Sequence, residues 1–213
     1  MDKKYELIKE YDYYRIKALK DFQLITGEIV KKGDIGGYVH GEHNLSQEGN
    51  CWIEGLSRAY GNSRVMDNAV LKYGSSSHHN SIVSGNAVMK DCSRAEDNSI
   101  ISGNAVMKDY SEALEFLTVA YGADGGAGSI GKWHDYLLKV KDFTKDTLIR
   151  VHYSGGGESG IILVTANQIH MFDNIQSFQM WLDSGNNTTA DLSSIDWKNR
   201  KFDYNKLTTY KEV

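Results

Sequence analysis

The chain has 213 residues, which allows one or two domains, and its formal net charge of −4 comes from acidic and basic side chains that are mixed along the sequence. Hydrophobic residues make up 40% of the chain, which is enough for a core, and no apolar run approaches the length of a membrane span. The lack of a basic stripe argues against nucleic-acid binding, and the acidic excess is too small to indicate a mimic of DNA.

Residues 1–48 are expected to form an N-terminal leader made of β-strands. Residues 11–19 and 22–30 are the predicted strands, separated by Lys20 and Asp21. Because the end of a repeat structure exposes unpaired strand edges, we expect the leader to cap the repeats that follow it.

Residues 49–114 divide into eleven consecutive six-residue units with no insertion. The third residue of every unit is small: Cys51, Ser57, Ser63, Ala69, Ser75, Ser81, Ala87, Ser93, Ser99, Ala105 and Ser111. The fifth residue is aliphatic or Ala in all units but the one that carries Ser77. A stronger period of eighteen is superimposed, since residues 81–91 (SIVSGNAVMKD) and 99–109 (SIISGNAVMKD) are nearly identical. This short fixed period predicts a solenoid.

The period of eighteen predicts a triangular rung of three short strands joined by tight corners. Side chains alternate across a strand, so the third and fifth residues of a unit point together into the interior. The predicted core consists of Val65, Leu71, Val83, Met89, Ile101 and Met107. Asparagine tolerates the left-handed backbone of a corner, and the predicted corner residues are Asn62, Asn68, Asn86, Asn98 and Asn104.

These units resemble the hexapeptide repeats of left-handed β-helix proteins. The segments 14–22, 32–38 and 44–52 are similar to the lead-in of a group of bacterial and phage β-helix proteins that are often labelled putative transferases or polymer-forming proteins. The resemblance covers about residues 13–115. It implies a left-handed parallel β-helix of about four coils, and an origin in a phage or prophage.

Beyond residue 114 the six-residue period ends. Residues 116–121 still read as a strand, and the glycine-rich segment 122–131 marks a boundary. Strands are predicted at 148–153 and 161–165 around a glycine-rich loop. A helix is predicted from the helical spacing of Ile175, Phe178, Trp181 and Leu182, with Asp173 and Gln176 at its start and Gly185 at its end. The predicted organisation is therefore a cap (1–48), a β-helix (49–121) and a small α+β domain (122–213), in a mainly β chain.

The two cysteines are expected to remain unpaired. Cys51 occupies a third position and should face inward, whereas Cys92 occupies a second position and should face a corner or solvent. With no disulfide and no signal peptide, we expect a cytoplasmic protein, which for a phage-encoded chain means the host cytoplasm.

Three motifs invite a chemical interpretation. The segment 126–132 fits G-x-x-x-x-G-K but is followed by Trp133 instead of Ser or Thr, so it is interpreted as a linker. His78 and His79 lie in the one atypical stretch of the repeats and are the candidate bases of an alternative function, a hexapeptide-repeat acyltransferase using acyl-CoA or a similar donor. His40 and His43 lack a third ligand in register, so we expect neither a metal nor another cofactor.

The fourth residues of the units are expected to point outward and to form one column on each of the three faces. The first column contains Trp52, Val70, Val88 and Val106, the second Arg64, Ile82 and Ile100, and the third Arg58, Ser76, Arg94 and Glu112. Soluble monomers seldom expose large apolar patches. Each apolar column is therefore expected either to be covered by the leader or the C-terminal region, or to form the interface of a homo-oligomer.

The sequence favours a non-catalytic module that binds a protein. The expected partner is a host protein, with inhibition of a host defence system as one instance, and neither a membrane nor nucleic acid is expected as a partner. The expected binding residues are Arg58, Ser76, Arg94 and Glu112 on the polar face, and Gly156 and Glu158 in the glycine-rich loop. The alternatives are the acyltransferase and a structural component of a particle.

Overall fold

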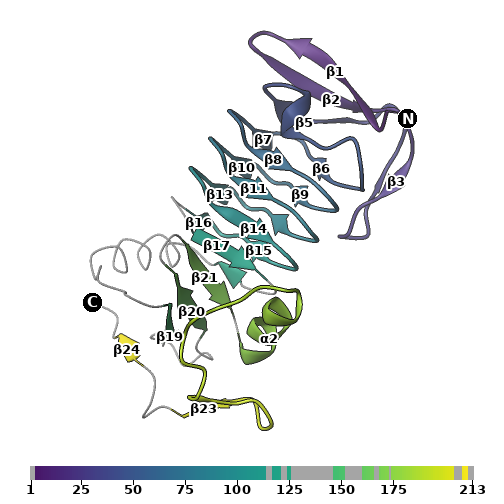
Figure 1. Ribbon diagram of the computed structural model, residues 1–213. Helices are drawn as coiled ribbons and strands as arrows, with labels where there is room; N and C mark the ends of the chain where they lie inside the picture. Colours follow the sequence, from purple (N-terminus) through teal and green to yellow (C-terminus); the bar gives the residue numbers. More distant parts are fainter. Residues whose placement is uncertain are drawn as a thin grey trace.

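The protein is a mainly β structure built around a β-solenoid of about four turns with stacked parallel strands. The computed structural model describes residues 3–113, 117–120, 124–125, 146–151, 160–165, 168–172, 174–203 and 208–210. The leader lies at one end of the solenoid, and the strands and helix that follow the solenoid lie at the other (Figure 1). Among the described residues no helix is long and apolar enough to cross a bilayer.

The solenoid strands form three parallel stacks. The first stack contains β7 (Arg58–Ala59), β10 (Ser76–Ser77), β13 (Arg94–Ala95) and β16 (Glu112–Ala113). The second contains β8 (Arg64–Val65), β11 (Ile82–Val83), β14 (Ile100–Ser102) and β17 (Leu117–Ala120). The third contains β6 (Trp52–Ile53), β9 (Val70–Leu71), β12 (Val88–Met89), β15 (Val106–Met107) and β18 (Asp124–Gly125). Strand partners lie eighteen residues apart, as in the pairing of Ser76 with Arg94 and of Val88 with Val106.

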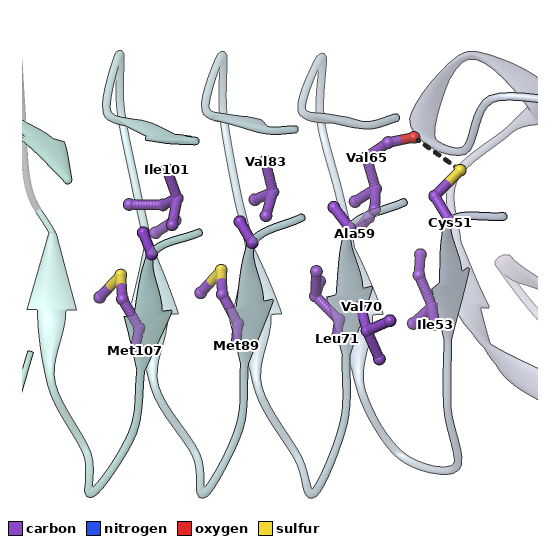
Figure 2. Close-up of a cluster of buried hydrophobic side chains, with 14 of the residues drawn as sticks. Cys51, Ile53, Ala59, Val65, Val70, Leu71, Val83, Met89, Ile101 and Met107 are labelled. Carbon is purple, nitrogen blue, oxygen red and sulfur yellow. Dashed lines mark hydrogen bonds between the residues drawn. The ribbon is translucent and has the colours of Figure 1, made fainter. Parts of the chain in front are cut away.

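The interior of the solenoid is filled by two sets of side chains. All the small third residues from Cys51 to Ser111 are fully buried, and so are the fifth residues, including all six predicted core residues. Figure 2 shows Ile53, Leu71, Met89 and Met107 aligned from rung to rung, with Val65, Val83 and Ile101 beside them. The core prediction is therefore confirmed. Each fully buried aliphatic side chain stabilises the fold by roughly 1.5–3 kcal/mol.

The corners depend on left-handed backbone and on asparagine ladders. The first residue of every unit has a positive φ, and six of these residues are not glycine: Asp67, Tyr73, His79, Asp91, Asp97 and Asp109. At one corner the amide of Asn68 donates to Asn86 (3.0 Å), and that of Asn86 donates to Asn104 (3.1 Å). At another corner Asn62, Asn80 and Asn98 are joined in the same way at 3.3 Å. The predicted corner asparagines are confirmed.

The leader joins the first stack of the solenoid. β1 (Tyr5–Glu10) pairs antiparallel with β2 (Tyr13–Ala18), which pairs antiparallel with β5 (Ile35–Val39). β5 then runs parallel to β7, so one seven-stranded sheet extends from β1 to β16. The 3₁₀ helix η1 (Glu42–Asn44) follows β5.

The expected single strand over residues 22–30 is wrong. Those residues form a hairpin of β3 (Phe22–Gln23) and β4 (Ile29–Val30) instead. The chain reverses at Gly27, whose φ of +90° suits a residue without a Cβ. The sequence did not predict β1 or β5, because polar and apolar residues alternate only weakly in these two segments.

Lys4 lies across the first rung of the solenoid and is fully buried. Its ammonium group donates to the carbonyl oxygens of Glu48 and Gly49 (both 3.3 Å) and of Cys51 (3.0 Å), and lies 3.1 Å from the Cys51 sulfur. Desolvation lowers the pKa of Lys4. The lysine therefore satisfies backbone acceptors that the end of the strand stack would otherwise leave without partners.

The residues that follow the solenoid continue its second stack. β17 pairs in parallel with β21 (Ile169–Phe172), which pairs antiparallel with β20 (Ile161–Val164), and β20 with β19 (Thr147–Val151). With β24 (Thr208–Tyr210) beside β19, an eight-stranded sheet runs from β8 to β24. The strands predicted at 116–121, 148–153 and 161–165 are confirmed where the structure describes them, and β22 (Ile195–Asp196) and β23 (Lys201–Phe202) add a short hairpin.

Helix α2 (Ile175–Asp183) packs on this sheet through its apolar side. Phe178 and Trp181 lie 5.0 and 5.7 Å from the ring of Phe172. The N-cap is Asn174, whose side chain accepts from the amide of Ser177 at 2.9 Å, so the prediction that Asp173 caps the helix is wrong. The helix ends at Ser184 and Gly185, as expected. The G-x-x-x-x-G-K segment lies outside the described residues.

Candidate functional site

The polar column of the solenoid lies on the first stack of strands. Arg58, Ser76, Arg94 and Glu112 occupy equivalent positions on β7, β10, β13 and β16, and each is paired with the next in register. The two arginines are exposed, and Arg94 lies 3.5 Å from the Glu112 carboxylate. The structure therefore brings together four of the six predicted partner-binding residues. The other two, Gly156 and Glu158, lie outside the described residues.

A partly open groove of about 520 Å³ crosses this column. It is lined by Leu56, Arg58, Gly74, Ser76, His78, Cys92, Arg94 and Glu96. The groove exists because the middle rung carries small residues, Gly74 and Ser76. Eighteen residues earlier the same two positions hold Leu56 and Arg58, and eighteen residues later they hold Cys92 and Arg94. A Cβ on Gly74 would lie 3.2 Å from the Cys92 sulfur, and the φ of Gly74 is +77°. Glycine at this position therefore keeps the floor of the groove open.

The Ser76 hydroxyl lies at the floor of the groove. The residue is only 8% exposed, and among the described residues its hydroxyl has no hydrogen-bond partner. The interior serines Ser63, Ser75 and Ser93 behave differently, since each donates to a backbone carbonyl of the rung at 3.0–3.2 Å. Ser76 thus presents an unused donor and acceptor to whatever occupies the groove.

A row of four aromatic rings ends at His78, which lines the groove. Tyr13 stacks on His40 (5.3 Å), His40 packs against Tyr60 (5.2 Å), and Tyr60 meets His78 edge-on (5.3 Å). Desolvation lowers the pKa of His78, which favours its neutral imidazole. The ring contact with Tyr60 helps to fix the orientation of His78 in the groove.

Arg15 and Arg58 both lie near the ring of Tyr38 on the neighbouring strand β5. The guanidinium of Arg15 lies 4.6 Å from the ring centre of Tyr38, and that of Arg58 lies 6.0 Å from it. Both distances are within the range of a cation–π interaction. The Tyr38 ring, on the side of Arg58 away from Ser76, therefore helps to position this arginine.

The two candidate catalytic histidines are separated by the corner between them. His78 lines the groove, whereas the Nδ1 of His79 lies 3.3 Å from the Asp97 carboxylate at the exposed corner. Their ring centres are 6.3 Å apart. Only His78 is thus placed to act on a molecule bound in the groove.

The histidines considered as metal ligands contact the backbone of Gly61. The amide of Gly61 donates to the Nδ1 of His40 (3.1 Å), and the Nε2 of His43 lies 2.8 Å from the Gly61 carbonyl oxygen. In the part of the chain that the structure describes, no three metal-binding side chains are grouped. Of the two cysteines, Cys51 is buried and Cys92 is exposed, both as free thiols, which confirms their predicted positions.

The apolar column that starts at Trp52 is covered in part by the chain itself. Trp52 and Val70 are buried in one cluster with Phe22, Leu24 and Val30 of the β3–β4 hairpin. The Phe22 and Trp52 rings pack edge-on at 5.4 Å, and Glu28 of the hairpin binds Lys72 at 3.0 Å. Trp52 and Val70 are therefore unavailable to a second molecule, which corrects their assignment to an oligomer interface. Val88, Val106, Ile82 and Ile100 remain partly exposed.

Exposed apolar residues at one corner were missed by the sequence reading. Leu56, Tyr73 and Tyr110 are 66%, 60% and 72% exposed, and they lie at the corner that borders the groove. A signal for them existed. The units that begin at this corner read GL, YG, DC and DY, whereas most other units begin with Gly-Asn or Asp-Asn.

Comparison of the chain with known protein families, with curated proteins and with solved structures found no match.

Proposed function

We propose that the protein binds a partner protein through the groove face, defined as the groove together with the exposed corner residues Leu56, Tyr73 and Tyr110. The observation that carries the proposal is the gathering of large exposed Leu, Tyr and Arg side chains around an open groove. Tyrosine and arginine are enriched among the residues that dominate binding energies at protein interfaces. Adjacent rungs are joined by backbone hydrogen bonds, so the face is rigid and loses little conformational entropy on docking.

The open shape of the groove supports a macromolecular partner over a small substrate. Pockets for small molecules bury most of their ligand's surface in a concave and largely apolar site. This groove is partly open to solvent, and charged side chains of both signs, from Arg58, Arg94 and Glu96, stand beside its mostly apolar lining. An apolar centre with charged side chains around it matches the anatomy of a protein interface.

The test is capture of partners from a bacterial lysate with the full chain as bait. The double variant Arg58→Glu with Arg94→Glu is expected to lose the captured partner. The matched control is Arg64→Glu, because Arg64 is also an exposed fourth-position arginine but lies on the second stack, in β8. Retention of the partner by the double variant, or equal loss with Arg64→Glu, would refute the proposal.

The acyltransferase remains a second candidate because His78 lines the groove. It requires binding of an acyl-CoA in calorimetry, and loss of turnover in His78→Ala. His79→Ala is the matched control, since His79 faces Asp97 away from the groove lining. Binding and turnover that both depend on His78 would replace the partner-binding proposal.

The proposal includes a homo-oligomer formed through the remaining apolar positions. Val88 with Val106, and Ile82 with Ile100, form two partly exposed pairs on adjacent rungs. Light scattering at tens of micromolar should give a mass above that of one chain, and Val88→Glu or Ile100→Glu should lower it. A monomeric wild-type protein would remove this part of the proposal.

We further propose that the solenoid is a left-handed β-helix of the hexapeptide-repeat type, encoded by a phage or prophage and acting on a protein of the host cytoplasm. The recurrence of positive φ at every sixth residue supports the repeat assignment. The host setting rests on the resemblance of the leader and repeats alone. A high-resolution crystal structure would test the handedness, and the identity of the captured partner would test the setting.

A further inference from the structure

We propose that the groove face recognises a carboxylate, supplied by an Asp or Glu side chain of the partner, which binds over Ser76 between Arg58 and Arg94. This inference rests on the proposed partner-binding function and specifies its chemistry. The fold alone does not produce this site, because the other two columns of the solenoid do not place a serine between two arginines.

The three residues are arranged symmetrically. Arg58 and Arg94 are both register partners of Ser76, one on the strand before it and one on the strand after it. Neighbouring strands are spaced by about 4.8 Å, so the two arginine backbones lie about 10 Å apart with the serine midway. Each guanidinium is a planar fork of donors that fits a carboxylate, and its flexible stem reaches across one strand spacing.

Small residues lie between the two arginines, and the Ser76 hydroxyl there is available for a hydrogen bond. Gly74 and Ser76 are the smallest side chains of the groove lining, so an incoming group can approach the rung itself. The Ser76 hydroxyl has no partner among the described residues, although its residue is 8% exposed. A carboxylate at this point would accept from the Ser76 hydroxyl. The guanidinium groups would reach it by turning inward, that of Arg58 from the Tyr38 ring and that of Arg94 from Glu112, and would then donate charge-assisted bonds.

The charges around the groove favour an isolated acidic side chain over a polyanion. Glu96 lines the groove, and Glu112 already lies 3.5 Å from Arg94. A nucleic-acid backbone would place further phosphates beside these carboxylates, where like charges repel. Desolvation lowers the pKa of His78, which disfavours a further positive charge in the groove. Leu56 at the rim offers an apolar contact for a residue that flanks the acidic one.

The probe for the test is a displayed library of random twelve-residue peptides, selected on the full-length chain. Enriched peptides are expected to share one Asp or Glu at a fixed position. In a synthetic, terminally blocked peptide, replacing that Asp by Asn should weaken binding at least tenfold. When the protein carries Arg94→Gln or Ser76→Ala, the same Asp-to-Asn replacement in the peptide should change the affinity less than threefold. When the protein carries the control substitution Arg64→Gln, the replacement should still weaken binding at least tenfold. Circular dichroism checks that each variant is folded.

Three outcomes would overturn the inference. Enriched peptides that lack a shared acidic residue would overturn it while leaving the partner-binding function in place, provided that their binding is lost in the Arg58→Glu and Arg94→Glu double variant. An Asp→Asn effect that is unchanged in Arg94→Gln and Ser76→Ala would place the carboxylate elsewhere. In the third outcome the library yields no binder, while inorganic phosphate alone binds the wild-type chain and fails to bind Arg94→Gln. That outcome would assign the site to a small anion instead.

Discussion

Replacing Leu71 by Ala tests the packing of the solenoid interior most directly. Leu71 is fully buried on β9, with Ile53 one rung before it and Met89 one rung after it. The change removes three carbon groups, which at about 0.8 kcal/mol each amounts to about 2.4 kcal/mol of lost transfer free energy. The neighbouring rungs are fixed by backbone hydrogen bonds and cannot fill the cavity, which adds to the cost. We expect Leu71→Ala to lower the free energy of unfolding by about 3–4 kcal/mol.

The measurement is urea unfolding followed by far-ultraviolet circular dichroism. The matched control is Leu56→Ala, because Leu56 is the same residue type at an exposed corner and should cost no more than about 0.5 kcal/mol. A loss below about 1 kcal/mol for Leu71→Ala, or an equal loss for the two variants, would refute the assignment of fifth positions to the core. Leu71→Asp would place an unpaired charge in the interior and is expected to prevent folding altogether.

Three further predictions concern Lys4 at the first rung, the asparagine ladders at the corners and His170 on β21. Lys4→Met should lower the free energy of unfolding by about 3 kcal/mol, because the carbonyls of Glu48, Gly49 and Cys51 lose their donor. Lys3→Met removes an exposed ion pair and should cost under about 0.5 kcal/mol, so equal losses in urea unfolding would argue against this role of Lys4. Asn86→Ala breaks two ladder bonds and should cost about 1–2 kcal/mol, more than Asn80→Ala with its longer bonds, as thermal melts would show. Burial lowers the pKa of His170 from 6.5 to about 4, so the unfolded state binds the proton more readily. Stability should therefore fall by about 2 kcal/mol between pH 7.5 and 5, and His170→Phe should flatten that dependence; an unchanged slope would contradict it.

The solenoid was predictable because a repeat places the same physical demand on every unit. Third positions such as Ala69 and Ser81 must be small, fifth positions such as Val83 must fill the interior, and first positions must accept a left-handed backbone. These demands are local and recur eleven times, so the sequence displays them as a period. The predicted columns of outward residues followed from the same alternation.

The parts that sequence reading missed depend on contacts between distant residues. The burial of Trp52 requires Phe22 and the turn at Gly27, and nothing in the local pattern indicates that a hairpin folds back over that face. The groove arises from the absence of side-chain volume at Gly74 and Ser76. The atypical stretch around these residues was noticed for its histidines, whereas its functional interest lies in how little space the middle rung occupies.

The near-identity of residues 81–91 and 99–109 has a consequence for how such a chain can change length. Neighbouring rungs are related by translation and share one register, so a duplicated or deleted segment of eighteen residues would leave every remaining strand paired. The first twin segment precedes Arg94 and the second follows it, so Arg94 lies in the stretch between them. Unequal recombination between them would lengthen or shorten the rod in steps of about 4.8 Å. Lengthening would move β19, β20 and β21 away from the groove and would leave Arg58, Ser76 and Arg94 in their mutual positions. Shortening would delete Arg94 and would bring Glu112 into register beside Ser76.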